Sequence, residues 1–287
     1  MKTSKSDTRA QPQKDLEPVV AVSQREIEDI EERSSPRTPV IYEIVRRLGE
    51  EEMARPVASL WWSGVAAGLS ISFSLVAQAL FEAYLPEAPW RHLVTSLGYC
   101  VGFIIVVLAR QQLFTEITIT AVLPLFATFT SRNVRKLTRL WSIVLIANFA
   151  GTMVAALFYT YVPAVSPALH NAMLEVSSGL LGQSALETFV KGIPAGFLIA
   201  AMVWLIPSAD TAQFHVISIT TYVIAAAGFM HIIAGSVEAF FLALNGAAGW
   251  DFVFGGFIVP VLFGNIIGGT ALFSLISYGQ VMHEIKG

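Results

Sequence analysis

The chain has 287 residues, of which 54% are hydrophobic and only 14% are charged, whereas soluble domains have about 25% charged residues. Residues 1–55 hold 22 of the 39 charged residues, so the remaining 232 residues carry too few charges to cover a water-soluble surface. The net charge of −3 gives no hint of nucleic-acid binding, and the single cysteine, Cys100, excludes an intrachain disulfide. These features predict an integral membrane protein.

Residues 1–55 are expected to form a cytoplasmic tail. The stretch 1–36 is polar and rich in Ser, Gln, Pro and charge, so we expect most of it to be disordered. Residues 39–53 differ, because four apolar residues follow the spacing i, i+3, i+4 and i+7 of an amphipathic helix. Those four residues are Ile41, Ile44, Val45 and Leu48. Such a helix would lie on the membrane surface or dock on the cytoplasmic face of a bundle.

Residues 56–287 are expected to form a transmembrane channel domain. Six apolar stretches lie there, at roughly 57–81, 93–129, 137–162, 188–207, 213–244 and 252–278. A helix needs about 20 apolar residues to span a membrane. The second stretch is overlong and interrupted around Arg110, and the fifth is interrupted around Gly228 to His231. We therefore predict an all-α protein with six transmembrane helices, in which spans two and five are broken.

The basic residues predict how the spans are oriented. With six spans, 15 of the 18 Lys and Arg residues lie on one side, in the tail, the loop between spans two and three, and the C-terminus. Short cytoplasmic loops carry an excess of Lys and Arg. We therefore expect a multi-pass protein of the inner (cytoplasmic) membrane with both termini in the cytoplasm.

The two halves of the domain resemble each other. The repeated motifs are Gly64–Gly68 and Gly192–Gly196 in spans one and four, and Asn148–Gly151 and Asn265–Gly268 in spans three and six. Each pair of small residues alone is typical of ordinary helix packing in membranes. Their ordered recurrence around a broken helix in each half predicts an inverted 3+3 repeat. Irregular backbone at membrane depth is tolerated only when it is buried in protein or lines a cavity, so the two breaks indicate a pathway.

His231 is the first candidate for a functional residue, since it is the only histidine deep in a span. Ionisable groups inside a membrane are costly and usually functional, and an imidazole could donate a proton to a solute or hydrogen-bond it. A neutral histidine that bonds a carbonyl exposed by the break explains it equally well. Thr115, at the matching break, could donate to a solute or bond backbone. Lys191, at the outer start of span four, could concentrate anions or extend to the interface.

Three motifs together resemble the formate/nitrite transporter family over roughly residues 57–280. They are Leu113-Phe114-Thr115, Gly228-Phe229-Met230-His231 and the span-six stretch Pro260–Gly269. The resemblance implies an aquaporin-like protomer in a homopentamer, with a pore through each protomer. Members move small monovalent anions such as formate, nitrite, lactate or hydrosulfide, in some cases with a proton.

The resemblance also implies roles for individual residues. His231 matches the central pore histidine, Thr115 lies on the loop that breaks span two, and Lys191 is similar to the vestibule lysine. Leu113 and Phe114 resemble residues that form an apolar constriction in the family. Without the resemblance, ordinary core packing accounts equally well for two apolar residues at these positions.

Four residues depart from the family pattern. Gly235 stands where the family usually has Asn, and Met230 precedes the histidine at a position that is often acidic. Glu116 follows the threonine where a small or polar residue is typical, and Glu238 adds a second carboxyl. Ionised carboxylates near a pore would repel anions and attract cations. They could instead be neutral, paired with Arg110, or turned away between helices, and we favour pairing or structural roles because isolated buried charges are rarely tolerated.

The leading hypothesis is a passive or proton-coupled channel for small monovalent anions, in which the central pore histidine, His231, could protonate or hydrogen-bond the anion. Its partners would be the lipid bilayer and a small solute. One alternative keeps the fold but passes a neutral solute or a cation selected by Glu116 and Glu238. Another is a regulatory membrane protein that acts through its N-terminal tail. The sequence contains no nucleotide-binding loop, metal-ligand cluster or nucleophile motif, so we expect no enzyme, no cofactor and no nucleic-acid partner.

Overall fold

The computed structural model describes residues 36–286 together with Ser23 and Arg25. The predictions for the tail 1–36 therefore lie almost entirely outside the described residues. All regular elements in the part that is described are helices. The compact membrane unit begins at Arg37, so it includes helix α2 (Thr38–Ala54), which composition alone groups with the tail.

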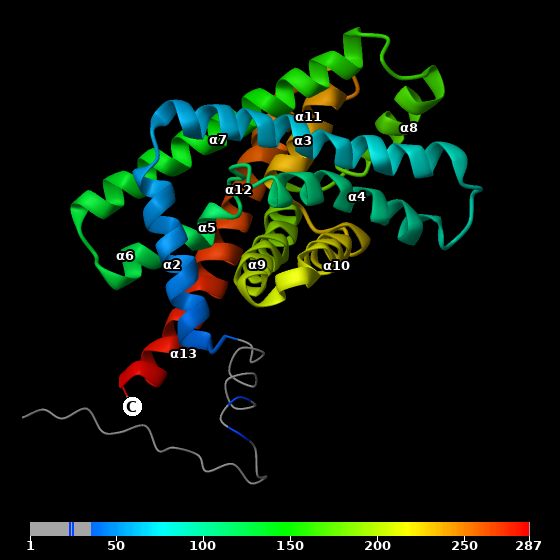
Figure 1. Ribbon diagram of the computed structural model, residues 1–287. Coiled ribbons are helices and arrows are strands. Elements are labelled where there is room, and N and C mark those ends of the chain that lie inside the picture. The colour runs from blue at the N-terminus through cyan, green and yellow to red at the C-terminus, as the bar shows by residue number, and fades with distance from the viewer. Residues whose placement is uncertain (1–22, 24, 26–35, 287) are drawn as a thin grey trace, which may run out of the picture. The chain divides into compact units, whose positions relative to one another are not determined.

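The bundle consists of six spans, which follow one another along the chain in the predicted order (Figure 1). The unbroken ones are α3 (Val57–Tyr84), α7 (Ser131–Tyr161) and α9 (Ala185–Ala209). Span six runs through η2 (Phe252–Ile258), α12 (Val259–Ile266), η3 (Ile267–Ser274) and α13 (Leu275–Lys286). Both η2 and η3 are π-helical, a rare form that is frequent at functional sites.

Spans two and five are broken, as predicted. Span two consists of α4 (Arg91–Leu108) and the short helices α5 (Ile117–Thr120) and α6 (Leu123–Ala127), and span five of α10 (Gln213–Ala226) and α11 (Ile232–Leu244). By length and composition, five helices among the described residues could cross a membrane. This number is one lower than the six predicted spans. Helices α9 and α10 are joined by a single 3-10 turn, η1 (Asp210–Ala212), and therefore count as one helix, while α11 is too short to be counted.

One further helix, α8 (Pro167–Ser178), lies in the loop between spans three and four. Its start has a strong local signal, since the Ser166 hydroxyl accepts a hydrogen bond from the Leu169 amide and a proline occupies the first turn. Helix α8 packs on α3 and α11.

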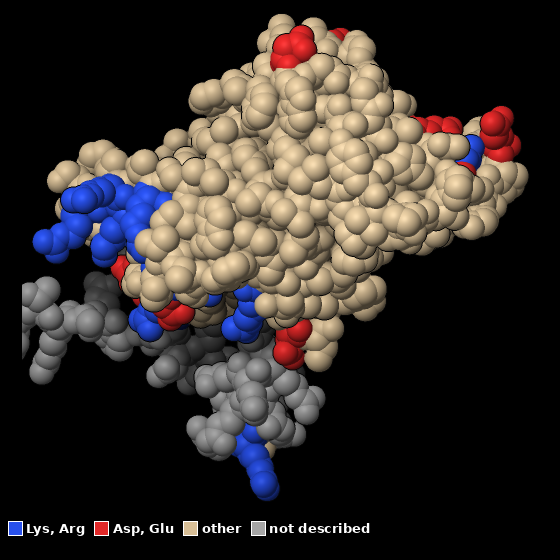
Figure 2. Space-filling model, turned by 90° about the horizontal axis from the view of Figure 1, so that it is seen from above, with Lys and Arg blue, Asp and Glu red and all other residues tan. Residues whose placement is uncertain are grey.

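The face of the bundle seen in Figure 2 is largely free of charge between its ends. Large apolar side chains on the spans are exposed, among them Phe158 on α7, Ile219 on α10 and Phe263 on α12. Basic residues gather at one end of the face shown in Figure 2, and the exposed Arg132, Arg135 and Lys136 open α7. A surface of this kind suits lipid along the spans and water at their ends.

Helix α2 packs a different face on the bundle from the one that its apolar pattern predicts. Tyr42, Val45, Gly49 and Met53 are buried, whereas Ile44 and Leu48, expected on the apolar face, are 38% and 40% exposed. The helix approaches α5 so closely at Gly49 that a methyl group there would overlap the Thr120 carbonyl. The close approach of α2 to α5 at Gly49, rather than the positions of the apolar residues, therefore determines which face of α2 is buried.

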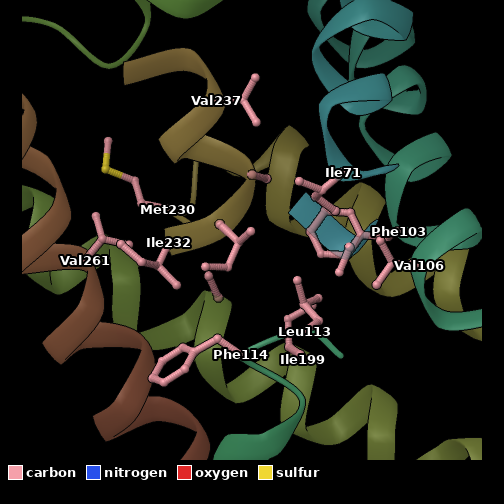
Figure 3. Packing of buried hydrophobic residues seen from close by; sticks show 14 of the residues in the cluster. Ile71, Phe103, Val106, Leu113, Phe114, Ile199, Met230, Ile232, Val237 and Val261 are labelled. Carbon is pink, nitrogen blue, oxygen red and sulfur yellow. The ribbon is translucent and has the colours of Figure 1, made fainter. Parts of the chain in front are cut away.

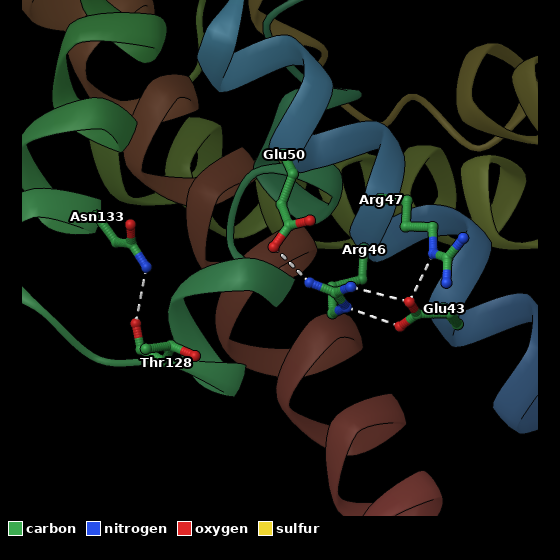
Figure 4. A network of polar contacts seen from close by, with 6 residues as sticks. All are labelled: Glu43, Arg46, Arg47, Glu50, Thr128 and Asn133. Carbon is green, nitrogen blue, oxygen red and sulfur yellow. Dashed lines mark hydrogen bonds and ion pairs between the residues drawn. The ribbon is translucent and has the colours of Figure 1, made fainter.

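Ion pairs join four side chains of α2 away from this buried face (Figure 4). The Arg46 and Arg47 guanidinium nitrogens each lie 2.7 Å from an oxygen of Glu43, and Arg46 also pairs with Glu50. These hydrogen bonds, from Arg46 first and then Arg47, lower the pKa of Glu43 to about 2. Because the pairs are partly exposed to solvent, each stabilises the helix only slightly.

Small residues let the helices of each half approach closely, in the same way in both halves. A Cβ atom at Gly64 on α3 would lie 2.7 Å from the Ala147 Cβ on α7, and one at Gly68 would lie 2.9 Å from the Gly151 Cα. In the second half, a Cβ at Gly192 on α9 would lie 3.2 Å from the Gly264 Cα on α12. Both contacts place backbone against backbone, as in small-xxx-small packing.

Gly196 and Gly268 extend the second contact. A Cβ at Gly196 would overlap the Asn265 backbone, and one at Gly268 would overlap the Ile193 carbonyl. The two crossings, α3 with α7 and α9 with α12, are the corresponding parts of the predicted inverted repeat.

Asn148 pairs the backbone groups that the break in span two leaves free. Its Oδ1 accepts from the Phe114 amide at 2.9 Å. Its Nδ2 donates to the carbonyls of Gly64 at 2.8 Å and Gln112 at 2.9 Å. One side chain thus ties the break to span one and span three, where no water is available to bond these groups.

Asn265 does the same for the break in span five. Its Oδ1 accepts from the Ile232 amide at 2.9 Å, and its Nδ2 donates to the Gly192 and Met230 carbonyls, each at 2.8 Å. By this equivalence Leu113, not Thr115, is the repeat partner of His231. An alignment of the two halves that matches Thr115 with His231 is therefore shifted by two residues from the alignment that the asparagine hydrogen bonds give.

Replacing Asn148 with Ala should lower the thermal melting temperature of the detergent-solubilised protein by at least about 5 °C, because it strands buried amide and carbonyl groups that each cost about 1–3 kcal/mol unpaired. Asn265→Ala should behave alike. Asn171→Ala, at an exposed position of α8, is the matched control. An unchanged melting temperature in Asn148→Ala would contradict this role.

Candidate functional site

The two breaks meet at His231 and Thr115. The Thr115 Oγ1 and the His231 Nε2 lie 2.6 Å apart, and the two residues are 0% and 1% exposed. His231 stands at the N-cap of α11, and Thr115 on the loop after α4. Residues that are 116 positions apart in the chain thus form one buried polar pair between the two halves.

The hydrogen bonds of His231 define which ring nitrogen carries the hydrogen. Its Nδ1 accepts from the Ala234 amide at 3.2 Å, which caps α11. A neutral imidazole has one acceptor and one donor nitrogen. The hydrogen therefore sits on Nε2 and is donated to the Thr115 hydroxyl oxygen. That oxygen already accepts from His231, so the hydroxyl hydrogen of Thr115 is free to be donated elsewhere.

Two aromatic side chains that were not predicted as site residues extend the site from this pair along α4. The Phe103 ring meets the His231 imidazole edge-on, with centroids 5.0 Å apart, and the Tyr99 ring lies 5.0 Å from Phe103. Tyr99 and Phe103 are one helical turn apart on α4, directly before the break. The spacing of Tyr99 and Phe103 could have indicated in the sequence that both face the site, because side chains at i and i+4 share a helix face.

Leu113 and Phe114 are fully buried beside Thr115. Both belong to the apolar cluster at the centre of the bundle. In Figure 3 the ring of Phe114 points away from Leu113, and its edge contacts Trp141 on α7, with centroids 5.7 Å apart. The two neighbours therefore have different surroundings, and Phe114 packs against span three.

Lys191 lies in the second turn of α9. Its backbone carbonyl accepts from the Met230 amide at 3.0 Å, so it helps to hold the second break. Its side chain is half-buried and makes no ion pair with any residue in the described ranges.

The two carboxyls that depart from the family pattern are not paired with Arg110. Arg110 is exposed and has left-handed backbone, with φ 52°, and no ion pair joins it to Glu116 or Glu238 within the described part. Glu238 is 9% exposed on α11 and interacts electrostatically with Tyr99. Glu116 is half-buried and interacts electrostatically with Glu52 of α2. Of the two explanations that we favoured, the structure therefore does not show the pairing with Arg110, and a structural role for the two carboxyls stays a prediction.

Gly235 is explained by packing. A Cβ there would overlap the ring of Phe257, a fully buried residue of the π-helical segment η2. The aromatic ring thus occupies the space that a larger residue at position 235 would need.

The described residues contain no group of three or more His, Cys, Asp or Glu that could hold a metal ion. The chemistry available at the site is hydrogen bonding from a hydroxyl and an imidazole within an apolar surround.

Comparisons with known proteins agree with this architecture. The family model for the formate/nitrite transporter matches residues 39–279. The chain is 41% identical over 262 residues to the inner membrane protein YfdC of Escherichia coli, covering 91% of this chain and 84% of that protein. It is 28% identical over 244 residues to the formate channel FocA of Haemophilus influenzae, covering 75% and 84%.

Solved structures show the same fold at low sequence identity. A pentameric formate channel with formate bound matches with a TM-score of 0.65 and 20% identity, covering 79% of this chain and 98% of that one. An ion channel of the formate/nitrite transporter family matches with a TM-score of 0.67 and 19% identity, covering 85% and 98%. The chain therefore belongs to the formate/nitrite transporter family.

Proposed function

We propose that this protein is a channel of the inner membrane that passes small monovalent anions such as formate or nitrite. Membership of the family supports the solute class. The name of the similar Escherichia coli protein supports the location, and the pentameric formate channel of similar fold supports a homopentamer. A channel role also fits a buried pair whose hydroxyl and imidazole can hydrogen-bond a solute.

The observation that carries the proposal is the buried contact between the Thr115 hydroxyl and the His231 imidazole, which leaves the hydroxyl hydrogen of Thr115 available when His231 donates to its oxygen. Moving an anion out of water into an apolar surround is costly unless the anion is hydrogen-bonded. The Thr115 hydroxyl can donate to the anion while its oxygen accepts from His231, and hydrogen bonds in such a chain strengthen one another. Thr115 is then the group that contacts the solute, and His231 the group that polarises and orients it.

Proton coupling enters the proposal through the solute. Because the Nδ1 of His231 caps α11, the ring remains neutral in this arrangement and the proton comes with the solute from the aqueous side. A solute that has taken up a proton crosses the apolar surround of Phe103 and Leu113 as the neutral acid, at much lower cost. Both side chains are fully buried, so they must move aside when the solute passes.

A second candidate function is a channel for a cation or a neutral solute. The observation that favours it is Glu238, a carboxyl that is 9% exposed and has no hydrogen-bond or ion-pair partner among the residues that the structure covers. An unpaired carboxylate at this depth would attract a cation and repel an anion.

Thr115→Val should reduce formate uptake at least about tenfold, because it keeps the shape of the side chain and removes the hydroxyl that would bond the anion. Thr115→Ser, which keeps the hydroxyl, should retain most of the uptake. The measurement is stopped-flow uptake into proteoliposomes, where uptake by the unaltered protein should also rise as the pH falls. Uptake by Thr115→Val equal to that by the unaltered protein would rule out the proposed contact.

Glu238→Gln separates the two candidate functions. If the solute is an anion, formate uptake should stay the same or increase, because no negative charge remains to repel it. If the solute is a cation, flux of ammonium or potassium should fall. Glu116→Gln, tested in parallel, reports on the second carboxyl. Cation flux in the unaltered protein that disappears in Glu238→Gln would replace our proposal with the second candidate.

A further inference from the structure

Glu52 on α2 bonds both sides of the broken segment in span two, although α2 precedes the first span. Its Oε1 lies 3.3 Å from the Gln112 Nε2, which donates to it, and its Oε2 accepts from the Thr120 hydroxyl. Gln112 and Thr120 stand before and after Thr115 in the chain. One carboxyl therefore bridges the two ends of the segment that carries Thr115.

The place of α2 against this segment is fixed by two further contacts. Gly49, one turn before Glu52, packs directly on the backbone carbonyl of Thr120. At the end of the helix, the Arg139 guanidinium of α7 donates to the Arg55 carbonyl at 2.8 Å and the Met53 carbonyl at 3.4 Å. The carboxyl is thus held at the break by a helix that is anchored on span three.

The segment from Gln112 to Thr120 needs such support, because it has little regular helix of its own. Asn148 holds its start. The Trp141 indole donates to the Ile117 carbonyl at 3.1 Å, and the Thr118 hydroxyl donates to the Thr115 carbonyl at 2.7 Å. These other restraints come from the spans or from the segment itself, whereas Glu52 alone supplies a carboxyl from outside them.

A carboxyl is an unfavourable choice for a merely structural contact at this place. Burial raises the pKa of Glu52, and the hydrogen bonds from Thr120 and Gln112 offset this only in part. The neighbouring Glu50 and Glu51 on the same helix are exposed, so they are matched carboxyls without these partners.

We propose that Glu52 is a positioning residue, which holds the segment around Thr115 so that the Thr115 hydroxyl meets His231 and selects the solute. The proposal rests on the proposed function, since Thr115 is the group that contacts the anion there. It adds a residue from outside the spans to the determinants of selectivity.

The first test is amide hydrogen exchange of the full-length protein in detergent. In Glu52→Ala, amides within 112–120 should exchange at least about tenfold faster, as expected when two hydrogen bonds to one carboxyl are lost. Glu52→Gln should keep the protection, because its amide can accept from Gln112 and donate to the Thr120 oxygen. Glu51→Ala is the matched control and should leave exchange unchanged. Equal exchange in Glu52→Ala and Glu51→Ala would overturn the proposal.

The second test is the ratio of formate to acetate uptake in proteoliposomes. Glu52→Ala should lower this ratio several-fold, and Glu52→Gln should restore it. Faster exchange without a change in the ratio would mean that Glu52 is only structural, and would also overturn the proposal. If the unaltered protein takes up neither anion, the proposed function fails, while the exchange comparison still decides whether Glu52 holds the segment.

Discussion

A helix that breaks inside a membrane exposes amide and carbonyl groups where no water can bond them, and the fold depends on how these groups are paired. Asn148 and Asn265 each bond one amide and two carbonyls across a break. Asparagine suits this task because its carboxamide group has an acceptor oxygen and a nitrogen with two donor hydrogens. Each asparagine also bonds the first span of its own half, so the break and the helix crossing are held by the same side chain.

Close helix packing makes these bonds possible. An asparagine reaches a carbonyl of the neighbouring span only when the two backbones nearly touch, and glycines at Gly64 and Gly192 allow that approach. In lipid, such packing also replaces the hydrophobic driving force that water would supply. The inverted repeat is thus a repeat of one physical solution, made of a small residue on the first span and an asparagine on the third.

The polar centre of the molecule follows from the two breaks. His231 uses one ring nitrogen to cap α11 and the other to bond Thr115, so the imidazole is part of the fold and part of the candidate site at once. Packing explains one departure from the family pattern, since Gly235 leaves space for Phe257. Helix α2 brings Glu52 to the break, where Glu52 interacts electrostatically with Glu116. A change at one of these positions therefore alters its partner as well.

Much of this architecture was predictable from local pattern. Apolar runs predict the spans, and small residues and asparagines at matching places in the two halves predict the inverted repeat. The interruptions around Arg110 and Gly228 correctly predict the breaks in spans two and five. The motif with Leu113, Phe114 and Thr115 and the histidine at position 231 lead to the correct family.

Three features could not be predicted, because they depend on contacts between distant segments. The asparagine hydrogen bonds set the alignment of the two breaks, because the amides of Phe114 and Ile232 each donate to the asparagine of their own half. The buried face of α2 is set by the close approach at Gly49, and so the bonds of Glu52 have no signature in the sequence. The sequence by itself determined the membrane fold and its repeat, which follow from composition and periodicity, and its family, which follows from the resemblance of short motifs. Only the tertiary structure decided which donors and acceptors meet, because hydrogen bonds depend on distances of a few ångströms between residues far apart in the chain.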